Sequence, residues 1–280
     1  SFVSGTTSGG ASGAIRLTTG AATNGRGGDM AFSIGAGTKS NGGDFALIAG
    51  ETSADSASGG HISVNAGAGS SSIAAQGGYM TFTSGTGNSA TGGSVSISTG
   101  KGTLTSSGSI IIQTRDAGTS GVSGHMLFQT GTSSSGSSGS ILVTTGRATG
   151  GKSGHITMSV SEGTVGTGGD IQVTAGNAIT GTGTTGGYIS LSTGTGSTSS
   201  SGSVLMKTMN AGTSGVSGHL IFKTGTTSSG SSGKLQLSTG DAAAGRSGSI
   251  KLSVGTATGN TGGDIKASSG DSSGHSGGAI

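Results

Sequence analysis

The sequence predicts an all-β fold, a parallel β-solenoid (β-helix) built from coils of about fifteen residues each. Three observations predict it. A motif ending in glycine, as at Gly20, Gly35 and Gly50, recurs along the chain at this spacing, with a few longer intervals. Each copy carries two apolar residues separated by one other residue, and the remainder of the copy is mostly Gly, Ser, Thr and Ala. Recurrence of one short unit at a fixed period is typical of solenoids.

The apolar pair of each copy predicts a β-strand. Residues two apart in a strand lie on the same face, so both columns of the pair are expected to point into a common interior. A third inward column, in which Thr is the commonest residue, is expected to fill a narrowing corner and to hydrogen-bond the backbone. The principal members of the two core columns are Ile15, Leu17, Phe32, Phe45, Phe82, Met126, Phe128, Ile141, Val143, Leu220, Phe222, Leu235 and Leu237.

The second limb of each coil is expected to be rich in glycine. The chain has 65 Gly and no Pro, and several copies contain glycine at every third position, as in Gly118, Gly121 and Gly124. Such spacing suits close backbone packing of the polyproline-II kind. A kinked second strand is the alternative, and the sequence leaves both open. In either case the second limb is thin, so the predicted coil has a flat cross-section with one apolar limb and one Gly-rich limb.

The repeats predict one continuous solenoid of about eighteen coils over residues 1–280. The phrase "AGTSGVSGHMLFQTG" at 117–131 returns as "AGTSGVSGHLIFKTG" at 211–225, which indicates six-coil super-repeats near 86–176 and 180–270. The first residues, "SFVSG", and the last, "GGAI", are two halves of one copy. We therefore expect an excerpt of a longer array whose coils stack end to end.

Composition and motifs exclude several function classes. Charged residues make up 8% of the chain, with a net charge of +3, and Lys and Arg do not gather beside aromatic residues, so no nucleic-acid partner is expected. No long apolar run predicts a membrane span. No nucleophile elbow, catalytic carboxylate pair or phosphate-binding loop stands out among the glycines. The sequence therefore predicts a protein that is not an enzyme and has no cofactor.

Two sets of residues are candidate sites. Asp29 and Asp44 would stack one strand spacing apart and are weak candidates for a cation, although the calcium-binding nonapeptide pattern is absent and no metal site is predicted. The second set consists of apolar residues at the outward position between the core columns. They indicate lateral contact with another solenoid or, equally, a covering loop of the same chain. These residues are Ile111, Leu127, Leu142, Leu205 and Ile221.

The chain resembles the Gly/Ser/Thr-rich tandem-repeat proteins of diatoms and related algae, in runs such as "SGSSGSILVTTG" at 135–146. The resemblance implies a surface or extracellular fibre. Together with the repeats it predicts a structural, filament-forming protein whose partners are copies of itself, end to end and laterally, with O-linked glycans on the Ser- and Thr-rich turns left open. One alternative is the stalk of an adhesin or phage-type fibre that carries a binding domain elsewhere. Another is an ice-binding solenoid, for which only Thr81 and Thr83 supply the required outward pair.

Overall fold

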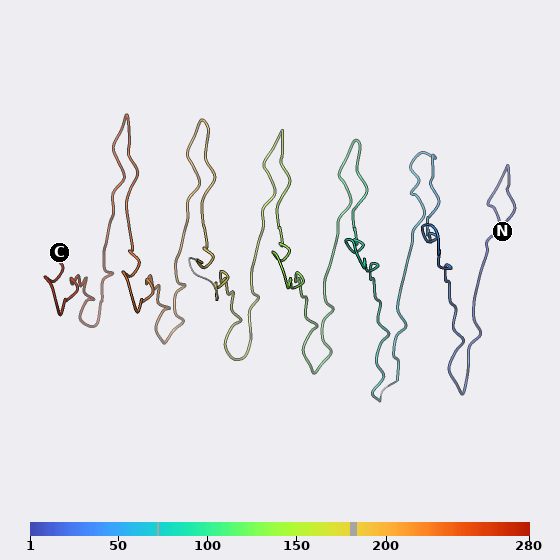
Figure 1. Cartoon of the computed structure of the whole chain (residues 1–280), viewed down its shortest axis with the longest axis horizontal. Coiled ribbons are helices and arrows are strands. Elements are labelled where there is room, and N and C mark those ends of the chain that lie inside the picture. The colour runs from blue at the N-terminus through green and yellow to red at the C-terminus, as the bar shows by residue number, and fades with distance from the viewer. Residues whose placement is uncertain (72, 180–183) are drawn as a thin grey trace. The chain divides into compact units, whose positions relative to one another are not determined.

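The computed structural model describes residues 1–71, 73–179 and 184–280, and within these ranges it contains neither a helix nor a strand. The ribbon in Figure 1 accordingly runs as extended segments joined by bends. The prediction of an all-β, parallel β-solenoid is therefore wrong. The chain divides into two units, Ser1–Leu142 and Val143–Ile280.

Both units are built from arms. An arm is an out-and-back loop that begins at the glycine closing one apolar segment and ends at the glycine before the next apolar segment. In the arm from Gly85 to Gly93 the bend lies at 88–90, and the Gly93 N–H donates a hydrogen bond to the Gly85 carbonyl at 2.9 Å. The same bond closes the base of the arms that begin at Gly50, Gly67, Gly100, Gly176, Gly194 and Gly270.

The closest side-chain packing lies at the base of the arms. There, the residue before the closing glycine faces a glycine of the returning limb. A Cβ built on Gly108 would lie 3.3 Å from the Thr99 Cβ. The Ser84 hydroxyl donates to the Gly93 carbonyl at 3.0 Å. This column, expected at the corner of a solenoid, thus packs across an arm. It also supplies most of the half-buried residues of the described chain: Ser4, Ala49, Ser84, Thr130, Ala175 and Thr224.

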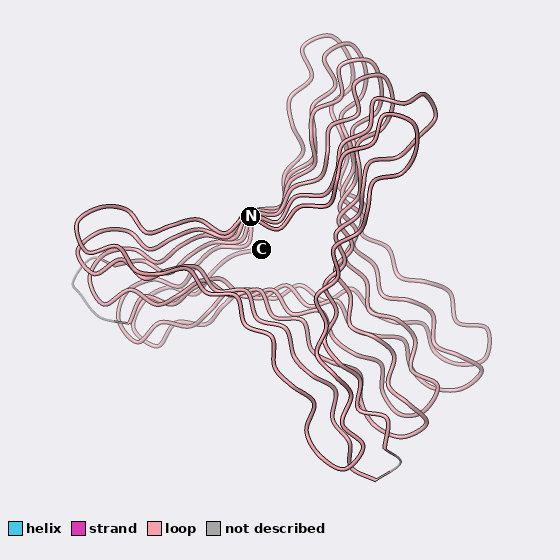
Figure 2. Ribbon diagram, turned by 90° about the vertical axis from the view of Figure 1, so that its right-hand side faces the viewer, coloured by secondary structure: helices cyan, strands magenta, loops and turns pink. Residues whose placement is uncertain are grey.

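The predicted core columns form no core. No apolar side chain among the described residues is buried. Successive arms of the ribbon point in different directions (Figure 2). Among the described residues, one aromatic contact is present: Phe32 and Phe45, on either side of one arm, have ring centroids 6.4 Å apart. The exposed core-column residues are Ile15, Leu17, Phe32, Phe45, Phe82, Met126, Phe128, Ile141, Val143, Leu220, Phe222, Leu235 and Leu237.

The predicted alternation of side chains is nevertheless present, because the side chains on one face of each apolar segment are less exposed than those on the other face. Met126 and Phe128 are 46% and 66% exposed, whereas Leu127 between them is 79% exposed. Other apolar triplets show the same order. Each extended segment therefore keeps one more sheltered apolar face and one open face.

A recurring G-x-G at the start of an arm brings two backbone stretches together. In the arm that begins at Gly194, a Cβ on Gly196 would lie 2.5 Å from the carbonyl oxygens of both Ser199 and Ser200, closer than real Cβ atoms approach. Gly37, Gly69, Gly87 and Gly102 are crowded in the same way. The second glycine of this motif is thus required by a close approach of the backbone.

We expect Gly196→Ala to open its arm, because backbone oxygens must move to admit the methyl group. The base hydrogen bond from Gly202 N–H to Gly194 O, 3.0 Å long, should then be lost, and the Gly202 amide should exchange at the rate of an unprotected amide. Gly194→Ala is the matched control, because nothing lies within 4 Å of a Cβ built there. Equal exchange in the two variants would contradict the role assigned to this glycine.

Candidate functional site

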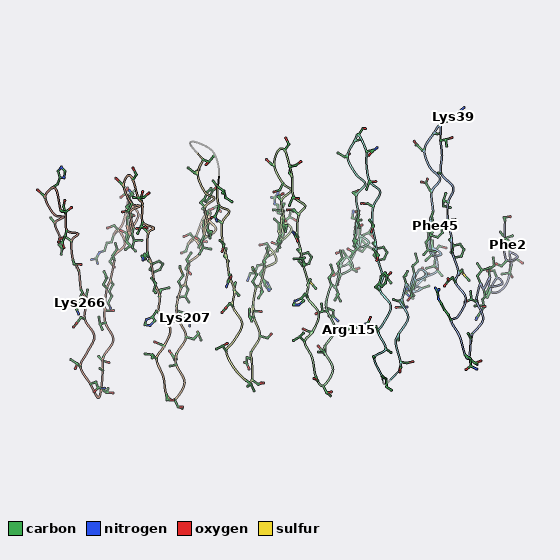
Figure 3. The ribbon with its side chains drawn as sticks, turned by 60° about the horizontal axis from the view of Figure 1, so that its bottom comes forward. Phe2, Lys39, Phe45, Arg115, Lys207 and Lys266 are labelled. Carbon is green, nitrogen blue, oxygen red and sulfur yellow. The ribbon has the colours of Figure 1, made fainter. Side chains whose placement is uncertain are left out.

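The candidate functional site is the repeated apolar face of the extended segments. Alternation along each segment places its apolar pair on one side of the backbone. Figure 3 labels Phe2 and Phe45 among the side chains that project from the ribbon. Phe2 is 95% exposed and Phe45 is 65% exposed. Because the pair recurs in nearly every copy, these faces form a regularly spaced series along the chain.

The opposite face of several segments is apolar as well. The residues expected to make lateral contacts are among the most open of the extended segments, each between 77% and 82% exposed, and no segment of the described chain covers them. They are Ile111, Leu127, Leu142, Leu205 and Ile221. Some segments thus present apolar side chains on both sides of the backbone.

Charged side chains are few and lie in water. The Arg26 guanidinium donates to the Asp29 carboxylate at 2.8 Å, so the aspartate considered as a cation ligand is paired with a nearby arginine. The Lys266 amino group lies 3.4 Å from Asp264. Both pairs are largely exposed and contribute little to stability. The sequence signal that indicates the first pair is an Arg three residues before an Asp, next to the bend at 23–25.

The described residues form neither a metal-binding cluster nor a cavity. Within the ranges that the structure describes, no three His, Asp or Glu side chains are grouped so that they could hold a metal ion, and Asp44 does not form such a group with Asp29. No cavity was found in the described chain. The described residues include no helix long and apolar enough to cross a bilayer.

Corresponding positions of the two super-repeats share their local geometry. The Ser133 hydroxyl donates to the Ser135 carbonyl at 3.1 Å, and the Thr227 hydroxyl donates to the Ser229 carbonyl at 3.0 Å. The following glycines, Gly136 and Gly230, have φ of 102° and 110°. Gly121 and Gly215, with φ of 129° and 117°, are a second such pair. These left-handed positions favour glycine because any side chain would be strained there.

No family model, no curated protein and no solved structure matches the chain. The candidate site is therefore defined by its geometry alone.

Proposed function

We propose that this chain is a structural, fibre-forming repeat protein, in which copies of the chain bury one another's apolar faces. One observation carries the proposal. The apolar pairs recur at a regular spacing, the two residues of each pair lie on the same face of their segment, and the described part of the chain leaves all of these pairs exposed. Burial of apolar surface is the main favourable term in protein association. A single copy leaves most of that term unused.

The amount of exposed surface supports association on a large scale. The chain exposes 27632 Å², whereas a compact protein of 25.9 kDa exposes about 10,500 Å² and a fully unfolded one about 37,600 Å². The chain thus exposes about 17,000 Å² more than a compact monomer of its mass. A standard protein interface buries roughly 1,200–2,000 Å². One such interface would cover only a small part of the excess, so we infer contacts along the whole chain.

The period favours a second copy as the partner. Apolar faces that recur once in every repeat are matched along their length by a surface with the same period, and another copy of the chain has that period by construction. In the described ranges, the backbone hydrogen bonds that the structure shows lie at a bend and at the bases of arms, so the extended segments offer backbone N–H and C=O groups as a template for pairing with another chain. Both features act on the same segments. The resemblance to surface repeat proteins keeps an extracellular or cell-surface location as a prediction.

Sedimentation and electron microscopy across a range of concentrations test this function. Dilute samples should contain single chains, and above a threshold concentration the chains should form filaments of variable length. Urea added to the filaments should release single chains, because it weakens apolar burial. A chain that stays monomeric at every concentration, or that forms only closed particles of fixed size, would rule out a fibre.

A further inference from the structure

We propose that neighbouring copies in the fibre run parallel and are shifted by one super-repeat, so that segment 100–176 of one copy lies along segment 194–270 of the next. The inference rests on the proposed function, and it adds the register. The register follows from three features of the chain: the spacing of the arms, the geometry of the bends and the placement of charge.

The spacing of the arms distinguishes this shift from the others. After Gly100 the repeats close at positions 116, 131, 146, 161 and 176, and after Gly194 they close in the same series at 210, 225, 240, 255 and 270. The interval from Gly176 to Gly194 is longer than any interval within either series. A shift of one repeat sets the 16-residue interval after Gly100 and the 18-residue interval after Gly176 against intervals of a different length, so it keeps at most four successive closing positions in step. The super-repeat shift keeps six successive closing positions in step.

The geometry of the bends matches at the same shift. The bends at 103–105, 119–121, 134–136, 149–151 and 164–166 recur at 197–199, 213–215, 228–230, 243–245 and 258–260. The hydroxyl-to-carbonyl bond of Ser133 recurs at Thr227. The open apolar residues Ile111 and Leu127 would lie opposite Leu205 and Ile221. The arms brought together thus have the same shape as well as the same length.

Charge separates the super-repeat shift from full alignment. With no shift, every charged side chain lies opposite the identical side chain of the neighbour, and like charges directly opposite one another are destabilising. With the super-repeat shift, Lys207 lies opposite Gln113, and Lys223 lies opposite Gln129. Most like-charge contacts are removed in this way.

The remaining charges of the two segments favour the shift on balance. Arg147 lies opposite Asp241, which is an attractive pair. Two like-charge pairs are left, Lys152 with Arg246 and Asp170 with Asp264. The second is relieved by Lys266, whose amino group is 3.4 Å from Asp264. Full alignment of the same segments offers no attractive pair.

Disulfide capture tests the register, because the chain has no Cys and every introduced thiol is unique. Ser134→Cys and Ser228→Cys lie one super-repeat apart in equivalent exposed bends, 134–136 and 228–230. Ala243→Cys, in the bend at 243–245, is the matched control one repeat further on. The variants are mixed in equal amounts in pairs, assembled and oxidised, and mass spectrometry identifies the linked peptides. A second pair, Ser120→Cys with Ser214→Cys, repeats the test in another arm.

We expect the link between positions 134 and 228 to exceed the link between 134 and 243, and the 134–134 link, by at least about tenfold, which requires a preference of only about 1.4 kcal/mol. Equal yields, or a majority of 134–134 links, in filaments that do form would overturn the register and leave the fibre function standing. If no filaments form, the function and the register fall together.

Discussion

A chain that carries Phe128→Ser and Phe222→Ser should fail to form filaments at concentrations where the parent chain does. Both phenylalanines belong to the apolar faces, where they are 66% and 59% exposed in the single chain. Burying a Phe side chain contributes about 1.5–3 kcal/mol, so losing two raises the threshold concentration about a hundredfold or more. Sedimentation of the assembled fraction against total concentration measures that threshold.

The matched control removes two apolar side chains that lie outside these faces. Leu104 belongs to the bend at 103–105 and is 96% exposed, and Val216 follows the bend at 213–215 and is 92% exposed. Leu104→Ser with Val216→Ser should shift the threshold by less than about fivefold, because each surface substitution typically changes stability by no more than about 0.5 kcal/mol. If the two double variants raise the threshold equally, the apolar faces are not the surfaces that associate.

The dilute chain should show no cooperative unfolding endotherm. A folded protein of 280 residues has an unfolding heat-capacity change of about 3.4–4.2 kcal/mol/K, from about 12–15 cal/mol/K per residue. This chain buries only about a quarter of the surface that an unfolded chain exposes. A compact protein of this mass buries nearly three quarters of that surface, so the heat-capacity change of this chain should be only about two fifths of the usual value. Scanning calorimetry well below the assembly threshold measures this quantity.

The same scan above the threshold is the control. Assembled chains should give an endotherm whose midpoint rises with concentration, because association stabilises by mass action. A sharp, concentration-independent endotherm of the full expected size in the dilute sample would mean that the single chain already has a buried core.

The sequence predicted the pattern of the chain but not its path through space. The spacing of Met126 and Phe128 indicated a segment with two unlike faces, and the two faces differ in exposure although the segment is not a strand. The same spacing suits stacked strands of a solenoid and single segments that stand apart. Which of them forms depends on the direction each arm takes, and that direction depends on backbone angles at bends such as Gly121 and Gly136. Glycine adopts many angles with similar ease, so its presence leaves the direction open.

The contact role of the residues between the core columns, such as Leu127 and Leu205, stays a prediction. The structure leaves them exposed, but it leaves the core columns exposed as well, so exposure does not single them out. The close approach at Gly196 was missed, although the G-x-G that marks it recurs along the sequence. The partner of Asp29 was missed because two aspartates one repeat apart were compared, while Arg26 is a near neighbour in the sequence.

Amide hydrogen exchange, measured on the dilute chain and on filaments of the same chain, tests the central claim most directly. We expect amides of the extended segments, including those of residues 126–128 and 220–222, to exchange without protection in the dilute chain and to become strongly protected in the filaments. Strong protection of these amides in the dilute chain would contradict the account, because the apolar segments would then be ordered without a partner.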